Sequence, residues 1–230
     1  MKNKAQPITV LVTAGPTRAY LDNVRYLSNY SSGQLGFEIC RALEKKGLRV
    51  IAVVGPCDAP FDQLKKTQVV TVQTVKEMSR EVKKICQQHS PQVVVLSAAV
   101  LDFEPKKTLK GKVSSKESWK IELVPTPKII DEITRDFPEV KKVAFKLEWK
   151  AKNLKQTKSF GQKTMNDKKS QALCLNYLSE IDALKHPAFF FTEDGKVKKL
   201  FSKIEIAKEI TRWVLANGSV HSGRRSQPKI

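Results

Sequence analysis

Apolar and polar residues follow two alternating periods along the first hundred residues of this chain. Short apolar runs of strand length occupy residues 8–14, 49–54, 68–72 and 93–98. Between these runs, apolar residues recur at the spacing of a helix face: Leu35, Ile39, Ala42 and Leu43, then Val75, Met78, Val82, Ile85 and Cys86. Strands that alternate with helices predict a parallel, doubly wound sheet, in which the continuous run at 93–98 is a central buried strand.

The second half of the chain is less regular. Residues 100–118 are rich in lysine and serine and predict a mobile flap. After it we expect strands at 120–124, 142–147 and 172–175, helices at 128–136 and between Leu147 and Ala172, a hairpin turning at Glu193-Asp194-Gly195, and a closing helix that carries Ile206, Ala207, Ile210, Trp213 and Val214. The predicted fold class is therefore α/β: a single Rossmann-like, doubly wound, mostly parallel sheet with a flap and a C-terminal hairpin. We expect one domain over residues 1–216 and a basic disordered tail over 217–230.

A long polar segment, residues 15–36, separates the first strand from the first helix. It reads GPTRAYLDNVRYLSNYSSGQLG, and loops of this length are uncommon unless they bind a ligand. Open α/β sheets bind ligands at the edge where such a loop lies, and free N–H groups at a helix start bind anions. The alternative is an ordinary capped helix after a long loop.

The order of residues in this segment and in four later ones resembles a known family. The first segment holds Gly-Pro-Thr-Arg from Gly15, Asp22, Val24-Arg25 and Ser28-Asn29-x-Ser31-Ser32-Gly33-x-x-Gly36. The later ones are AAVLDFEP from Ala98, Lys112 ten residues after Asp102, VPTPKII from Val124 and FKLE from Phe145. Over about residues 8–201 the chain resembles phosphopantothenate–cysteine ligase in its stand-alone form.

The resemblance implies roles for individual residues. Asn29 and Lys112 would be catalytic, Asn29 holding the reacting carbonyl and intermediate and Lys112 offsetting charge on the leaving pyrophosphate. The implied nucleotide-binding set is Gly15, Ser31, Ser32, Gly33, Ala98, Ala99, Asp102, Lys112, Pro127, Lys128, Ile129, Ile130, Phe145, Lys163 and Lys168. The implied substrate-binding set is Thr17, Arg18, Asn29 and Asn176.

Some of these assignments have plausible alternatives. Two alanines let a flat base approach the main chain and a carboxylate can accept from sugar hydroxyls, but Asp102 taken alone would be a cap or turn residue. Lys112 taken alone would be one more surface lysine, and Lys110 and Lys116 are its nearest rivals. The chain departs from the family pattern at Ser114 and Ser115, where lysines are usual, and at Tyr177, where aspartate is usual.

The implied reaction joins 4′-phosphopantothenate to cysteine through an acyl-nucleotide intermediate, at the expense of CTP or ATP with Mg²⁺. The FKLE form leaves open which triphosphate is used. Positioning and charge stabilisation would carry the reaction, so neither a protein nucleophile nor a metal site built by the protein is expected. Relatives are homodimers in which one subunit helps to complete the other's phosphopantothenate site, so the resemblance also implies a dimer.

The formal net charge of +19 admits three interpretations. A strong positive charge suits a nucleic-acid-binding protein, an enzyme with anionic substrates, or a merely lysine-rich surface. The lysines are spread along the chain without an aromatic RNA-binding string or zinc-ligand spacing. We therefore expect no nucleic-acid partner.

Cysteine usage and hydropathy indicate the compartment. Cys40, Cys57, Cys86 and Cys174 have no CxxC spacing, which suits reduced residues of a cytoplasmic protein. We find no signal peptide and no apolar stretch of the roughly 18–20 residues that a membrane span needs, so no membrane partner is expected. The rival enzyme class, an NADP-binding Rossmann oxidoreductase, would need GxGxxG after the first strand, where this chain has Gly15-Pro16-Thr17.

Overall fold

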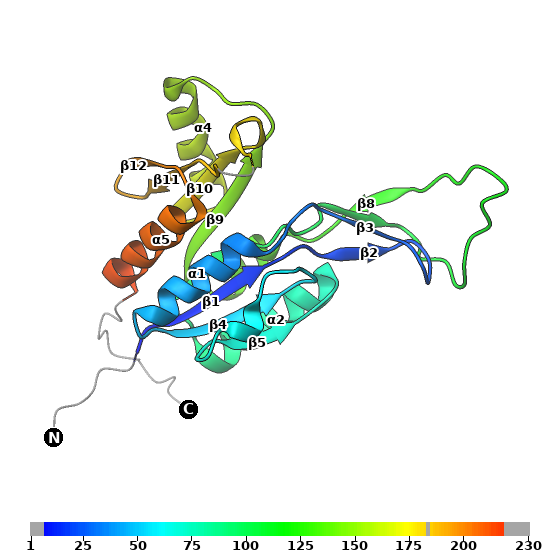
Figure 1. The fold of residues 1–230 in the computed structure, drawn as a ribbon, viewed down its shortest axis with the longest axis horizontal. Helices are drawn as coiled ribbons and strands as arrows, with labels where there is room; N and C mark the ends of the chain where they lie inside the picture. Colours follow the sequence, from blue (N-terminus) through cyan, green and yellow to red (C-terminus); the bar gives the residue numbers. More distant parts are fainter. Residues whose placement is uncertain (1–6, 183–184, 219–230) are drawn as a thin grey trace, which may run out of the picture.

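A parallel sheet forms the centre of the molecule in the computed structural model, which describes residues 7–182 and 185–218 (Figure 1). Within these residues, eight strands pair in the order β12-β11-β10-β9-β6-β1-β4-β5. Their bounds are β1 Thr9–Ala14, β4 Arg49–Val54, β5 Gln68–Thr71, β6 Val93–Leu96, β9 Lys141–Glu148, β10 Ala172–Tyr177, β11 Ala188–Thr192 and β12 Val197–Leu200. Only β11 and β12 run antiparallel to their neighbours, which confirms the predicted α/β class with its C-terminal hairpin.

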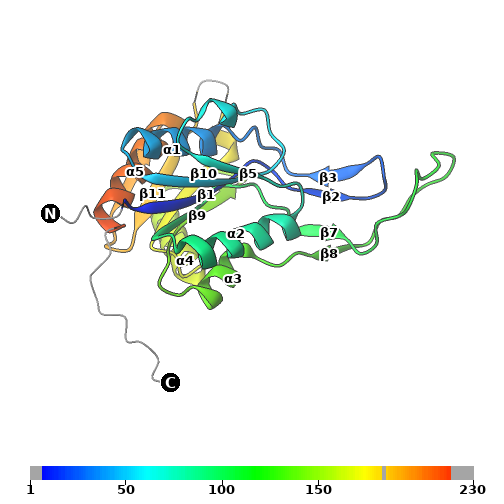
Figure 2. The same ribbon diagram turned by 90° about the horizontal axis from the view of Figure 1, so that it is seen from below.

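Helices cover both faces of this sheet (Figure 2). Helices α1 (Gln34–Lys45) and α5 (Lys203–Asn217) lie on one face, and α2 (Val75–His89), α3 (Ile129–Asp136) and α4 (Leu154–Asp167) lie on the other. The alternation of side chains along β1 explains the two layers. Val10 and Val12 belong to the core that includes α1 and α5, whereas Leu11 belongs to the core beneath α2 and α3.

The predicted helix between Leu147 and Ala172 is present as α4, and Gly161 lies within it. A Cβ at Gly161 would come within 2.2 Å of the Phe191 ring, so the glycine lets the helix pack closely on β11. Asn153 caps the first turn by accepting a hydrogen bond from the Gln156 N–H at 2.9 Å, and Gln156 reaches back to the Asn153 N–H. The glycine is thus a packing residue rather than an interruption.

Two short hairpins depart from the sequence prediction. The segment predicted as one long loop contains β2 (Arg18–Tyr20) paired with β3 (Tyr26–Ser28). The ends of the predicted flap pair as β7 (Phe103–Pro105) and β8 (Leu123–Pro125), so the strand expected at 120–124 begins later. These four strands and the flap between β7 and β8 form an arm that extends away from the central sheet in both views (Figures 1 and 2).

The predicted domain boundary at residue 217 falls at the last residue of α5, and residues 219–230 of the expected tail lie outside the described residues. No helix in the described part of the chain is long and apolar enough to span a bilayer.

Candidate functional site

The carboxyl ends of β1 and β6 lie side by side at the switch point of the sheet. From β1 the chain continues through α1 to β4 on one side, and it returns through α2 to β6 on the other. The Ala99 N–H donates to the Gly15 carbonyl at 2.9 Å, and the Ser97 hydroxyl donates to the Thr13 carbonyl at 2.6 Å. Ligands of open α/β sheets bind in the crevice at such a point.

The loop before α1 presents backbone rather than side chains to this crevice. Gly33 caps α1 with φ 73°, a conformation that favours glycine. A Cβ at Gly33 would lie 2.4 Å from the Cys57 Sγ, so a side chain there is also excluded by contact. The first turn of α1 holds no acidic residue, and its N-cap, Gly33, has no side chain that could accept from it. The Ser31 and Ser32 hydroxyls accept from the Gly33 and Gln34 N–H groups at a long 3.4 Å. This helix start can therefore bind an anion.

A pocket of about 160 Å³ is lined by Thr13 of β1, Leu96 of β6 and Ala144 of β9, among others. Eight of the residues predicted to bind nucleotide line it: Ala98, Asp102, Pro127, Lys128, Ile129, Ile130, Phe145 and Lys168. Five others that sequence reasoning did not select complete its walls: Thr13, Leu96, Val100, Leu101 and Ala144. Most of the lining is apolar with charges at a few points, which suits a planar group that carries polar substituents.

Charged side chains of both signs surround the pocket. Lys128 forms an ion pair with Asp102 across its mouth. Burial lowers the pKa of the Lys168 ammonium, and the nearby charge of Lys146 lowers it further. Lys146, which sequence reasoning missed as a site residue, also pairs with Glu148 at 3.0 Å. Asp102, Asp131 and Glu148 lie close to these three lysines, and Lys168 is the lysine of the pocket lining whose pKa is lowered. An anion bound here would favour the charged form of Lys168.

Asn29 connects the two loops of the switch point. Its side chain is exposed, and its amide nitrogen donates to the Val100 carbonyl at 3.0 Å and to the Ala99 carbonyl at 3.4 Å. These two bonds occupy the amide N–H₂ and fix the orientation of the side chain. The contact joins Asn29 to Ala99, which lies next to the pocket without lining it.

Two residues predicted to touch substrate are buried instead. Thr17 has no exposed surface, and its hydroxyl accepts from the Leu101 N–H at 3.0 Å. Asn176 is nearly as buried and donates to the Pro187 carbonyl at 2.6 Å. In this structure both side chains use their polar groups for hydrogen bonds within the fold.

Three further predicted residues lie outside the pocket. Lys163 is exposed on α4, and Lys112 is exposed on the flap of the arm. Arg18 stands over the Tyr26 ring, with 4.3 Å between guanidinium carbon and ring centroid, and lines a different cavity of about 990 Å³ along β4 and β5.

This larger cavity is the weaker candidate for a site. Valines of β4 and β5 line it, and three of its charged side chains already have partners within the fold: Arg80 pairs with Glu81, and Glu77 closes the cap of α2. Cys57 also lines it and packs against Gly33. The one signal for that contact in the sequence is the pair of glycines, Gly15 and Gly33, whose lack of a side chain leaves room for Cys57.

No group of three or more His, Cys, Asp or Glu side chains within residues 7–182 and 185–218 is arranged to hold a metal ion. All four cysteines are free. Burial raises the pKa of the Cys57 thiol, so this half-buried cysteine beside the α1 start is not activated as a nucleophile.

Fold and site together define an open α/β protein with a basic ligand pocket at the switch point of its sheet. Residues 5–217 match the model of the DNA/pantothenate metabolism flavoprotein C-terminal domain. The chain belongs to this family.

Two relatives and one solved structure illustrate the likeness. The coenzyme A biosynthesis bifunctional protein CoaBC of Thermococcus kodakarensis is 40% identical over 139 residues, which cover 60% of this chain and 34% of that protein. The CoaBC of Haemophilus influenzae is 28% identical over 225 residues, which cover 93% of this chain and 53% of that protein. A crystal structure of the C-terminal domain of CoaBC superposes with a TM-score of 0.72 at 27% identity and covers 93% of this chain and 96% of that one. The chain therefore spans about half the length, or less, of these curated relatives.

Proposed function

We propose that this chain is a phosphopantothenate–cysteine ligase, acting in coenzyme A biosynthesis in the cytoplasm. It would join 4′-phosphopantothenate and cysteine at the expense of CTP or ATP. The observation that carries the proposal is the convergence of eight family-motif residues, from four separate segments, on one pocket at the switch point. Membership of the family, whose listed relatives are named for coenzyme A biosynthesis, supports the same activity.

The reaction would proceed in two halves. The carboxylate of 4′-phosphopantothenate attacks the α-phosphorus of the triphosphate, forms an acyl-nucleotide and expels pyrophosphate. The amine of cysteine then attacks the acyl carbon and releases the nucleoside monophosphate. Neither half needs a protein nucleophile, so binding, orientation and charge stabilisation are what the chain must supply.

The nucleotide would lie across the pocket and the start of α1. Its base would lie between the Ala98 backbone and Phe145. Its phosphates would bind the N–H groups at the start of α1 and replace the long contacts, at 3.4 Å, that the Ser31 and Ser32 hydroxyls make with the Gly33 and Gln34 N–H groups. Lys128 and Lys168 would balance phosphate charge. Mg²⁺ would enter with the triphosphate and be held mainly by phosphate oxygens, because Asp102 is the only acidic residue that lines the pocket and is paired with Lys128.

Asn29 would hold the reacting carbonyl and the intermediate by turning an amide N–H from the Ala99 carbonyl, its longer contact at 3.4 Å, to the substrate. Its amide nitrogen is engaged by Ala99 and Val100, which leaves the side chain anchored between the two loops that flank the crevice. Lys112 would offset charge on the leaving pyrophosphate. Because Lys112 lies on the arm and outside the pocket, the arm would have to bring this side chain to the bound triphosphate.

The proposal includes a homodimer formed through the arm. Seven exposed large apolar side chains lie on it or at its base: Val24, Tyr26, Tyr30, Phe103, Leu109, Ile121 and Leu123. Apolar side chains gathered in this way favour contact with another surface. The arm also carries a residue with a proposed catalytic role, so a second copy of the chain is the occupant that suits the proposed reaction.

One assay tests the proposal directly. The purified chain is incubated with 4′-phosphopantothenate, cysteine and Mg²⁺, with either CTP or ATP, and 4′-phosphopantothenoylcysteine is measured by mass spectrometry. We expect product with at least one triphosphate, together with one pyrophosphate per product. Absence of product with both, from a folded protein, would contradict the proposed function.

A further inference from the structure

The turn between β2 and β3 binds the first half of the flap, residues 106–113, along its length. The Thr108 hydroxyl donates to the Tyr20 carbonyl at 2.9 Å, and the Leu109 N–H donates to the Leu21 carbonyl at 3.0 Å. The Asn23 N–H donates to the Gly111 carbonyl at 3.1 Å. The flap that the sequence predicted to be mobile is therefore attached to the arm at several points.

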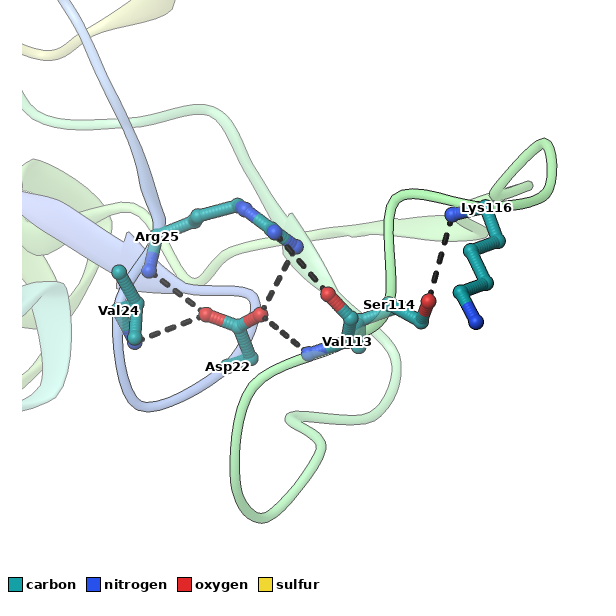
Figure 3. Close-up of polar contacts among 6 residues, drawn as sticks. All are labelled: Asp22, Val24, Arg25, Val113, Ser114 and Lys116. Atoms are coloured by element: carbon teal, nitrogen blue, oxygen red, sulfur yellow. Dashed lines mark hydrogen bonds and ion pairs between the residues drawn. The ribbon is translucent and has the colours of Figure 1, made fainter.

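The last attachment uses both backbone groups of Val113 (Figure 3). The Val113 N–H donates to Asp22 Oδ2 at 3.1 Å, and the Val113 carbonyl accepts from Arg25 Nη2 at 3.0 Å. Arg25 Nη1 in turn pairs with Asp22 Oδ2 at 3.1 Å. Asp22 and Arg25 thus form a closed arrangement around one residue of the flap, which we call the Asp22–Arg25 clamp.

The Asp22 carboxylate is built into its place. Its side chain has no exposed surface, and Oδ1 accepts from the Val24 and Arg25 N–H groups at 2.8 and 2.7 Å. Burial would raise the pKa of Asp22, but the three backbone N–H donors and the Arg25 charge outweigh it and lower the pKa. Both oxygens must accept, so only a carboxylate satisfies the arrangement.

Arg25 makes the remaining contacts of the clamp. Its guanidinium carbon lies 5.6 Å from the centre of the Trp119 ring, within the range of a cation–π interaction. Between residues 106 and 123, Val113 and Trp119 are the half-buried residues, and the others are exposed. Arg25 contacts both, so the inward side of the flap is organised around this one side chain.

We propose that Asp22 is a positioning residue for the ligase reaction: with Arg25 it holds Val113 and thereby fixes the location of the adjacent Lys112. This inference rests on the proposed function for its catalytic consequence. Lys112 itself is exposed, and both its chain neighbours, Gly111 and Val113, are bonded to the β2–β3 turn. The clamp therefore determines where this lysine can act, without contacting substrate.

The first measurement is cysteine-free pyrophosphate release under single-turnover conditions. Asp22→Asn keeps the shape but has one oxygen and one N–H₂, so it cannot accept on both sides. We expect it to slow pyrophosphate release about tenfold or more, and Arg25→Gln to do the same. Arg41→Gln is the matched control, because Arg41 also pairs with an acidic residue three positions earlier, Glu38, but on α1. It should retain the wild-type rate.

A double variant distinguishes positioning from a general structural role. If Asp22 acts through Lys112, then Asp22→Asn combined with Lys112→Gln should release pyrophosphate no more slowly than Lys112→Gln alone. Multiplicative losses in the double variant would overturn the proposal, as would a wild-type rate in both Asp22→Asn and Arg25→Gln.

Hydrogen exchange at the Val113 N–H tests the clamp without any activity. We expect Asp22→Asn to lose protection in the peptide that contains Val113, while the protection of β1 and β6 stays unchanged. Unchanged protection at Val113 would overturn the clamp. A wild-type chain that releases no pyrophosphate would instead contradict the proposed function, and with it the catalytic consequence proposed for Asp22, even if exchange supports the clamp.

Discussion

At the scale of single residues, Asn29 offers a direct test of the site. It is exposed and anchored by two bonds to backbone carbonyls, so Asn29→Ala should change the free energy of unfolding by about 1 kcal/mol or less. Ligase activity should fall at least about tenfold, because a positioned hydrogen-bonding group at the reacting centre is lost. Steady-state turnover and thermal melting are the measurements.

The control for Asn29 is Asn217→Ala. The Asn217 amide also donates to a backbone carbonyl, that of Trp213 at 2.9 Å, but it lies at the end of α5. This variant should keep full activity. An Asn29→Ala enzyme that is folded and as active as the Asn217→Ala control would contradict the role given to Asn29.

The lowered pKa of Lys168 predicts that nucleotide affinity depends on pH. Its pKa is lowered by burial and then by Lys146, so in the free protein it loses its proton at a lower pH than an ordinary lysine does. A bound triphosphate favours the charged form, so binding takes up a proton and affinity should fall as pH rises through the lowered pKa. Titration calorimetry of CTP and ATP at several pH values measures this, and Lys168→Met should abolish that part of the pH dependence.

The same shift predicts the effect on stability. A lysine whose pKa is lower in the folded state than in the unfolded state reduces the free energy of unfolding while it is charged. This loss of stability disappears as the pH rises from the pKa of the folded state towards that of the unfolded state. Lys168→Met should therefore raise the melting temperature at neutral pH. The control is the exposed Lys158 of α4, the helix that Lys168 caps. Lys158→Met should alter neither the melting temperature nor the affinity for the triphosphate.

The residues of the site were predictable to a limited extent. Motif order selected eight residues that line the pocket. Ala98 and Asp102 follow the carboxyl end of β6, which a parallel sheet brings to its binding edge, whereas the other six were found by the motif alone. The same reasoning did not reveal that Thr17 and Asn176 are buried, since a polar residue in a motif can serve the fold or the ligand. Nor did it separate Lys163, which lies within α4, from Lys168, which caps the C-terminus of α4 and lines the pocket, because the end of this helix was not predicted from the sequence.

At the scale of elements, long periodic segments were predicted well and the arm was not. Helices α1 and α2 have one buried face, which imposes a helical period on their residues. Strands β1 and β4 are buried on both faces and therefore read as continuous apolar runs. The hairpins β2–β3 and β7–β8 have three residues per strand, nearly all of them half-buried or exposed, so the strands are too short and too little buried to show a period. The turn between β2 and β3 is closed by the Asp22 side chain rather than by a glycine, which removed the usual turn signal.

The flap carries the prediction that belongs to this scale. Lys112→Gln removes a charge next to the Asp22–Arg25 clamp, and cysteine-free pyrophosphate release should slow by about 10²-fold, as for loss of one transition-state electrostatic contact. Lys110→Gln and Lys116→Gln, in the same exposed segment, should each cost much less. If Lys116→Gln has the large effect and Lys112→Gln does not, the role belongs to Lys116 and the motif alignment is wrong.

At the scale of the whole molecule, the exposed apolar side chains of the arm predict a dimer, and charged substitutions among them should dissociate it. Ile121→Lys with Leu123→Lys places two ammonium groups on this surface and should convert the dimer to monomer in analytical ultracentrifugation. Phe201→Lys is the control, since Phe201 is 59% exposed but follows β12 at the other end of the sheet. A wild-type chain that sediments as a monomer at micromolar concentration would contradict the proposed dimer.

The direction of the arm makes a stronger prediction about how the two subunits share the chemistry. The arm extends away from the central sheet (Figures 1 and 2). Lys112 lies in the flap between β7 and β8 and is not among the residues that line the pocket. We therefore expect Lys112 of one subunit to serve the pocket of the other. Mixing Asn29→Ala with Lys112→Gln, each nearly inactive alone, should then restore activity, because a mixed dimer pairs the intact Asn29 of one chain with the intact Lys112 of the other.

Random exchange of subunits should recover about a quarter of the wild-type activity, since about half of the dimers are mixed and each has one complete site. The assay is product formation after the two variants are mixed and incubated long enough to exchange. If Lys112 acts within its own subunit, each mixed dimer has two defective sites and mixing restores nothing. That result would require the arm to fold back over the pocket of its own chain, and the hydrogen bonds that hold residues 108–113 to the β2–β3 turn would have to move with it as one unit.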